Sequence, residues 1–307
     1  MNNEPNTNRQ HFAYLILAAS AFFLAMGHVI TRGVHEQVPP LGLTFCRWLI
    51  ATVFLLPLVW RDFKNSLGIY RRYWQKFLLA GVLVVGGTSA LTVALNFTTA
   101  TNVTMINASQ PAFTALLSWM LYRERLHIAQ VLGIVVALAG VLMMICRGDP
   151  RVLGTLEFNG GDLIAMAAVW GLAGYAICYA RISHGLSTPS ALLPIILAGC
   201  LCLLPFYMWE SVVYKVVPIN RVSVSAILAI AFFSSFVAMI MWNRGNHLVG
   251  ANLASMFINL IPIFGVLLAV TFLEEIVEGY HIVGMLMIGC GVWLVLGRGV
   301  TRTTGAT

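Results

Sequence analysis

The sequence predicts an all-α polytopic membrane protein with ten transmembrane helices, arranged as two inverted five-helix repeats. Its 307 residues are 59% hydrophobic and only 9% charged, with a mean hydropathy of +0.86. Soluble domains carry about 25% charged residues, so a water-soluble fold is excluded. About 20 apolar residues span the hydrocarbon core of a bilayer. Apolar stretches of about that length recur along this chain, and two of the later ones repeat the pattern of earlier ones.

The predicted spans are the apolar stretches between charged residues and turn residues. The first stretch follows eleven polar residues and has no small-residue cleavage site, so we expect a retained helix instead of a secretory signal. Most loops are short, which leaves no room for an extramembrane catalytic domain. The ten predicted spans are residues 12–31, 40–60, 77–97, 103–122, 128–146, 161–180, 190–208, 223–242, 250–273 and 281–297.

Basic residues predict how the spans are oriented. With the N-terminus inside, twelve Lys and Arg residues fall in inner loops and tails and five in outer loops, and the loop 61–76 supplies five of the twelve. Cytoplasmic loops carry such an excess, so residues 1–11 and 298–307 are predicted to be cytoplasmic tails. The net charge of +7 is scattered among these loops and does not form one basic face, which argues against a nucleic-acid partner.

An internal repeat divides the spans into two halves, predicted at 12–146 and 161–297. A constant offset of 151 residues pairs Pro111 with Pro262 and Glu124 with Glu275, without a gap. The paired segments belong to the fourth and ninth spans, which cross the bilayer in opposite senses. Inverted repeats are typical of secondary transporters with a site near the midplane. A channel can also contain them.

These features resemble the drug/metabolite transporter superfamily, and within it the EamA-like ten-helix exporters. The pattern P-x4-LL-x6-E precedes a glycine-punctuated helix in the first half. FCRWLIA at 45–51 resembles the arginine-bearing second helix of the family, and AVWGLAGYA at 168–176 resembles its Trp-Gly motif. The first half departs from this motif, with Phe23-Leu24 at the corresponding place. The resemblance implies a transporter of the bacterial inner membrane, closest in type to exporters of amino acids, including aromatic ones.

Three stripes of polar residues at helical spacing predict a polar interior. Hydrocarbon offers no hydrogen bonds, so polar side chains there face a cavity or a partner helix. The alternative is that these residues bridge packed helices, each contributing about 0.6 kcal/mol. Pro111 and Pro262, one in each half, could each act as a hinge or could form a static kink that helps packing. The stripes are Ser89, Thr92 and Asn96; Thr104, Asn107, Pro111 and Thr114; and Asn252, Ser255, Asn259 and Pro262.

Aromatic residues on the sixth and eighth spans supply the other predicted part of a binding cavity. They are Trp170, Tyr175, Tyr179 and Trp242. Many membrane Trp and Tyr residues are interfacial anchors. Trp170 lies about ten residues into its span, near the midplane, where an anchor fits poorly.

Two titratable side chains inside spans have both a functional and a structural interpretation. His28 lies near the outer end of the first span, where it could hydrogen-bond a substrate or relay a proton, or simply be satisfied by a neighbour. Arg47 could attract a substrate carboxylate, or could reach outward to the interface as a structural residue.

What the spans lack narrows the function further. All eleven acidic residues fall in tails, loops or helix ends, so a carboxylate-driven cation antiporter is disfavoured. No cluster of basic residues lies within the spans to bind phosphate. No HExxH, GxSxG or CxxC motif is present, so we expect no enzyme, no metal and no cofactor.

The sequence therefore predicts a secondary transporter, acting as a monomer or weak homo-oligomer in the lipid bilayer. It would export small neutral or zwitterionic metabolites, amino acids above all, by alternating access through a central cavity. Alternatives are a carrier or channel for another solute (a lipid, a drug or a nucleotide-sugar-like molecule) and an intramembrane enzyme.

Overall fold

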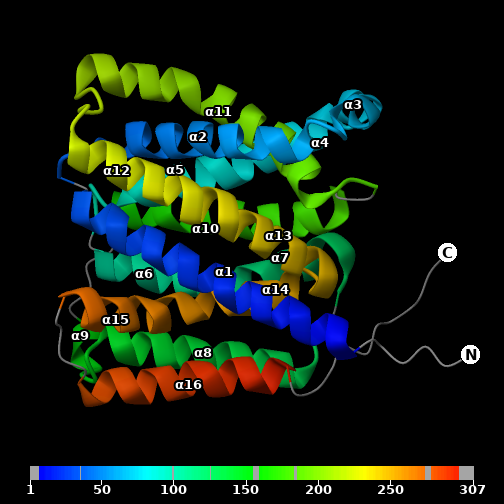
Figure 1. Ribbon diagram of the computed structural model, residues 1–307. Coiled ribbons are helices and arrows are strands. Elements are labelled where there is room, and N and C mark those ends of the chain that lie inside the picture. Colours follow the sequence, from blue (N-terminus) through cyan, green and yellow to red (C-terminus); the bar gives the residue numbers. More distant parts are fainter. Residues whose placement is uncertain are drawn as a thin grey trace, which may run out of the picture.

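The computed structural model describes residues 7–34, 36–98, 100–124, 126–154, 159–182, 185–273 and 278–296. Every regular element in these ranges is a helix, and the long helices run side by side across the molecule (Figure 1). α1 begins and α16 ends on the same side of the bundle, which we call the N-terminal end; the opposite side is the far end. The tail 298–307 and most of the tail 1–11 lie outside the described residues, as does Glu275.

The helices of the two halves follow one another along the chain. The first half comprises α1 (Thr7–Val34), α2 (Pro40–Val59), α3 (Phe63–Arg72), α4 (Trp74–Gly81), η1 (Val82–Gly86), α5 (Gly87–Ala94), α6 (Ala100–Ala108), α7 (Gln110–Tyr122), α8 (Ile128–Ile145) and α9 (Arg151–Gly154). The second half comprises α10 (Gly160–Ile182), α11 (Thr188–Val213), α12 (Arg221–Ala229), η2 (Ile230–Val237), α13 (Ala238–Val249), α14 (Ala251–Met256), η3 (Phe257–Asn259), α15 (Leu260–Leu273) and α16 (Gly279–Leu296).

Within the described ranges, eight helical stretches are long and apolar enough to cross a membrane, and Gly279–Val295 is a shorter apolar helix. The fourth predicted span, 103–122, is not among them because it is divided at Ser109 into α6 and α7. The fold class predicted from composition and periodicity is confirmed: the chain is an all-helical, polytopic membrane protein.

Glycines repeated between the halves join α8 to α16. A Cβ atom on Gly140 would lie 2.7 Å from the carbonyl oxygen of Gly284, and one on Gly133 would lie 2.6 Å from that of Gly291. The offset of 151 residues relates Gly133 to Gly284 and Gly140 to Gly291. Each glycine therefore meets the repeat equivalent of the other, as two antiparallel copies related by a twofold axis would. Small residues allow helix backbones this close an approach in membranes.

The other helix contacts follow the same relation. α1 packs against α13 and α15, and its counterpart α10 packs against α5 and α7. α2 packs directly against α11, its own counterpart. Each half therefore completes the other instead of folding apart from it, and the limits of the two repeats, 12–146 and 161–297, stay a prediction.

The fourth and ninth spans are both interrupted just before their prolines. α6 stops at Ala108 and α7 starts at Gln110, with Pro111 in its first turn, while the 3₁₀ segment η3 separates α14 from α15, whose third residue is Pro262. A proline has no N–H to donate and its ring clashes with the carbonyl four residues earlier. The sequence predicted a hinge or a kink at each proline, and the structure has breaks.

The third and eighth spans share a different irregularity. η1 connects α4 to α5 and η2 connects α12 to α13, and both are π-helical. The repeat offset carries Val82 into the middle of η2. π-helical turns are rare and occur frequently at functional sites. The hydropathy pattern did not predict them, because an apolar stretch reads the same whether its helix is regular or widened.

The stretch 61–76, predicted as a basic loop, is mostly helical. α3 lies across the N-terminal end, and α4 begins at Trp74, three residues before the predicted start of the span (Figure 1). Leu67 and Trp74 are exposed there beside Arg71 and Arg72. Basic and aromatic side chains together suit the interface between membrane and water.

Candidate functional site

Buried amides lie at both helix breaks. Asn259 ends η3 and is 1% exposed, and neither its amide oxygen nor its amide nitrogen has a hydrogen-bond partner. The side-chain oxygen of Asn107, next to the end of α6, also lacks one. A buried polar atom without a partner costs about 1–3 kcal/mol, so these amides are available to a ligand or to water. Interrupted helices are where secondary transporters place substrate sites.

The other residues of these two stripes are less uniform. Ser255 is buried and its hydroxyl donates to the backbone oxygen of Asn252 at 2.9 Å. Thr104 is exposed in α6, whereas Thr114 is buried and donates to the carbonyl of Gln110 within α7. The two prolines, Pro111 buried and Pro262 partly exposed, each lie within one turn of their break.

Aromatic pairs stand beside the breaks in both halves. Trp170 of α10 lies 5.0 Å from Phe113 of α7, and Phe22 of α1 lies 5.6 Å from Phe264 of α15 (ring centroids). The repeat offset relates Phe113 to Phe264. The sequence predictions did not include Phe22, Phe113 or Phe264, although that offset was enough to pair two of them. Trp170 is partly exposed, as a side chain lining an opening would be.

Three predicted aromatic residues are instead buried among other side chains. Tyr175 is 3% exposed and donates to Asn243 Oδ1 at 2.7 Å. Tyr179 belongs to the largest apolar core cluster, and Trp242 packs with Leu17 in another. Tyr175 and Tyr179 share one core cluster and Trp242 lies in another, and a contact with substrate stays a prediction for all three.

The third-span stripe also finds its partners locally. Ser89 donates to the carbonyl of Val85 and Thr92 to that of Thr88, both within their own span. Asn96 is exposed in the turn after α5. Packing accounts for the contacts of this stripe.

Polar residues of α13 were missing from the sequence predictions. Asn243 and Asn246 are fully buried, and Asn246 donates to the carbonyl of Ala176 at 2.8 Å. Both amides tie α13 to α10 beside Tyr175. Their spacing of three residues was the available signal, but charged and titratable residues nearby (Arg244, His247) placed the segment at the edge of its predicted span.

At the N-terminal end, a polar network joins the two halves. Arg181 Nη2 at the end of α10 lies 2.8 Å from Glu124 Oε1 just after α7, and Asn252 Nδ2 of α14 donates to Glu124 Oε2 at 3.3 Å. The Arg181 guanidinium also lies 3.3 Å from the ring centroid of Tyr122. Glu124 thus connects the fourth, sixth and ninth spans.

Two titratable side chains, His28 of α1 and Arg47 of α2, lie toward the far end. Arg47 lies close enough to His28 for the two to interact electrostatically. His28 has a large exposed surface, although protein atoms surround it densely. His28 therefore keeps accessible surface although it lies among the helices of the bundle.

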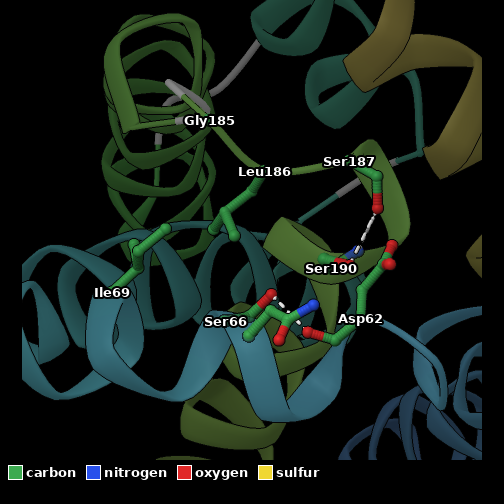
Figure 2. A pocket seen from close by; sticks show the side chains of 8 residues that line it. Asp62, Ser66, Ile69, Gly185, Leu186, Ser187 and Ser190 are labelled. Carbon is green, nitrogen blue, oxygen red and sulfur yellow. Dashed lines mark hydrogen bonds between the residues drawn. The ribbon is translucent and has the colours of Figure 1, made fainter.

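A separate hollow of about 230 Å³ lies at the N-terminal end, between α3 and the start of α11 (Figure 2). Asp62, Ser66, Ile69, Leu186 and Ser190 are among its lining residues. None of the predicted site residues lines it. Next to it the hydroxyl of Tyr70 donates to the carbonyl of Ser190 at 2.7 Å, and burial raises the pKa of this phenol above its ordinary value.

A bundle of membrane-spanning helices with paired, interrupted helices and unpartnered polar atoms at the interruptions is typical of membrane transporters. The EamA-like transporter family model matches residues 11–146 and 159–297, so the chain belongs to this family. The two matches cover one half of the chain each.

Relatives agree with this assignment. The Uncharacterized transporter YyaM of Bacillus subtilis (strain 168) is 28% identical over 80% of each chain. A Probable amino-acid metabolite efflux pump of Escherichia coli (strain K12) is 23% identical over 87% of this chain and 88% of its own. A crystal structure with 19% identity superposes with a TM-score of 0.76 over 92% of this chain and 95% of that one, which shows the shared fold. These names and the family indicate a transporter and not an enzyme.

Proposed function

We propose that this protein is a secondary transporter that exports small neutral or zwitterionic metabolites, amino acids including aromatic ones above all. It would work by alternating access in a bacterial inner membrane, with both termini in the cytoplasm. The observation that carries the proposal is that unpartnered polar atoms lie at both repeat-related helix breaks: the whole side-chain amide of buried Asn259 and the side-chain oxygen of partly exposed Asn107.

The amides suit an uncharged or zwitterionic solute. Each offers both a donor and an acceptor and carries no charge. The aromatic pairs Trp170–Phe113 and Phe22–Phe264 beside them would contact an apolar or aromatic side chain. Distant relatives in Escherichia coli and Salmonella typhimurium bear the name Probable amino-acid metabolite efflux pump, which supports the same substrate class.

The irregular segments support alternating access. Two helices are interrupted and two contain π-helical turns, one of each kind in either half. Such segments hold fewer regular backbone hydrogen bonds and absorb changes in direction more easily than continuous helices. Under this proposal, the network at the N-terminal end would close the cytoplasmic side, and the exposed His28 toward the far end would face the outside.

Counterflow in liposomes tests the proposal. Purified protein loaded with an unlabelled amino acid should accumulate the labelled one saturably, with stimulation from the opposite side. Asn107→Ala and Asn259→Ala should raise the half-saturating concentration about tenfold, corresponding to about 1.4 kcal/mol. Asn65→Ala, on the exposed face of α3, serves as the matched control and should change nothing.

The outcome separates the alternatives. Flux without saturation or stimulation from the opposite side would contradict a carrier and favour a channel. Saturable exchange that Asn107→Ala and Asn259→Ala leave intact would locate the substrate elsewhere.

A further inference from the structure

Arg47 is an internal cation at a defined depth. It is the eighth residue of α2, roughly 10 Å along the helix from its far end at 1.5 Å per residue. His28 lies six residues before the end of α1 at Val34, at a similar depth from the same end. An arginine within a span costs about 2.5–3.5 kcal/mol on insertion scales unless water or a counterion compensates it.

No carboxylate supplies that compensation. Within the ranges that the structure describes, no acidic side chain forms an ion pair with Arg47. The acid on neighbouring α11, Glu210, is occupied, because it accepts the N–H groups of Leu41 and Gly42 at 3.0 and 2.7 Å. The groups that interact with Arg47 are the ring of Trp48, 5.1 Å away, His28 and the thiol of Cys200.

Both side chains keep accessible surface. Arg47 is partly exposed and His28 is exposed, although both have dense protein surroundings. An arginine that reached outward to the interface would not have the thiol of Cys200 near it, since Cys200 is the thirteenth of the 26 residues of α11. The guanidinium therefore lies inside the bundle, with no anion of the described protein beside it.

We propose that Arg47 and His28 bind the carboxylate of the transported solute. This inference rests on the proposed function and narrows its substrate class to solutes that carry one carboxylate. The guanidinium presents parallel N–H donors that match the two carboxylate oxygens, and the imidazole adds one further donor. The amides at the helix breaks remain for the rest of the molecule. One arginine without a second cation suits a carboxylate better than a phosphate, which carries more charge.

The test compares an amino acid with its carboxamide in counterflow and competition. The wild type should prefer phenylalanine to phenylalaninamide at least tenfold in half-saturating concentration. Arg47→Gln should weaken phenylalanine at least tenfold and change phenylalaninamide by less than about threefold. His28→Ala should act in the same direction with a smaller change. Arg221→Gln, an exposed arginine at the start of α12, is the matched control and should leave both values unchanged.

Each outcome has a defined meaning. Absence of saturable exchange in the wild type contradicts the proposed function itself. Exchange with no preference for the acid over the amide overturns the carboxylate site, whether or not any variant folds. If Arg47→Gln, Arg47→Lys and His28→Ala all keep the preference for the acid, Arg47 is structural and the carboxylate site is overturned. The same holds if the variants weaken the acid and the amide equally. The carboxylate site is supported if Arg47→Gln weakens phenylalanine selectively. If Arg47→Gln does not fold, the same selective weakening in Arg47→Lys and His28→Ala supports it.

Discussion

The two ends of the bundle use charge in opposite ways. At the N-terminal end, Arg181 is paired with Glu124 at 2.8 Å and thereby connects helices of both halves. Toward the far end, Arg47 has no acidic partner within the described residues and stands beside an accessible histidine. The paired charge stabilises one arrangement of helices, whereas the unpaired charge is left available for a ligand.

The repeat makes this comparison position by position. An offset of 147 residues, which aligns Phe23 with Trp170, also aligns His28 with Tyr175. Tyr175 is buried and donates to Asn243, while His28 is exposed. Under the proposed alternating access, equivalent places in an inverted pair would face opposite sides of the membrane, so one conformation would fill the place of Tyr175 and open that of His28. We expect the reverse arrangement in the other state of the transport cycle.

The close packing of α8 against α16 at their glycines supports both ends of the bundle. Disrupting it should lower the stability of the protein more than any other change proposed. Gly140→Leu would drive a side chain into the Gly284 carbonyl, 2.7 Å from the new Cβ. Backbone cannot yield as a side-chain tip can, so we expect a loss of several kcal/mol and little folded protein. Size-exclusion profiles after detergent extraction measure it.

Gly289→Leu is the control for this prediction. Gly289 lies on α16, the helix that Gly140 packs against, and a Cβ atom added to it would have no neighbouring atom within 4 Å, so it should accept leucine. Normal folding of Gly140→Leu would show that the packing between α8 and α16 tolerates a large side chain. The two ends of the bundle would then not be held in place by this contact.

The repeat-equivalent pair His28 and Tyr175 gives the next largest effect. Tyr175→Phe leaves the Asn243 oxygen buried without its donor, which should lower stability by about 1–3 kcal/mol. His28→Phe should leave stability nearly unchanged and reduce transport of acids. Thermal unfolding and counterflow of the two variants measure the contrast. If both substitutions changed stability and transport equally, the distinction between the buried position of Tyr175 and the exposed position of His28 would be contradicted.

Much of this fold could be predicted because its signals are long and repeated. Span length and the offset of 151 residues both act over tens of residues, and a few irregular positions do not erase them. The breaks at Ser109 and η3 and the π-helical turns depend on local backbone geometry, and hydropathy carries no information about it.

The site was predicted less evenly, for a physical reason. Asn107 and Asn259 were predicted as site residues because an amide in hydrocarbon needs an explanation wherever it lies, and their contact with substrate stays a prediction. Tyr175, Tyr179 and Trp242 have a large apolar body and a polar tip, so they fit a core as well as a cavity, and only packing decides between these. Arg47 could be located from the sequence but its lack of an acidic partner could not, since that depends on what the neighbouring helices bring near it.

The network at the N-terminal end should give the smallest change in stability and a measurable change in access. Glu124 and Arg181 are about half exposed, and exposed ion pairs contribute roughly 0–1 kcal/mol, so Arg181→Gln should unfold nearly as the wild type does. The same small free energy shifts a two-state equilibrium up to about fivefold.

A cysteine placed at Asn259 should then react several times faster with a water-soluble thiol reagent applied from the N-terminal side. Arg244→Gln, an exposed arginine at the same end, should leave that rate unchanged. An unchanged rate in Arg181→Gln would mean that packing alone closes this end, and the contrast between a paired and an unpaired arginine would then concern only the far end.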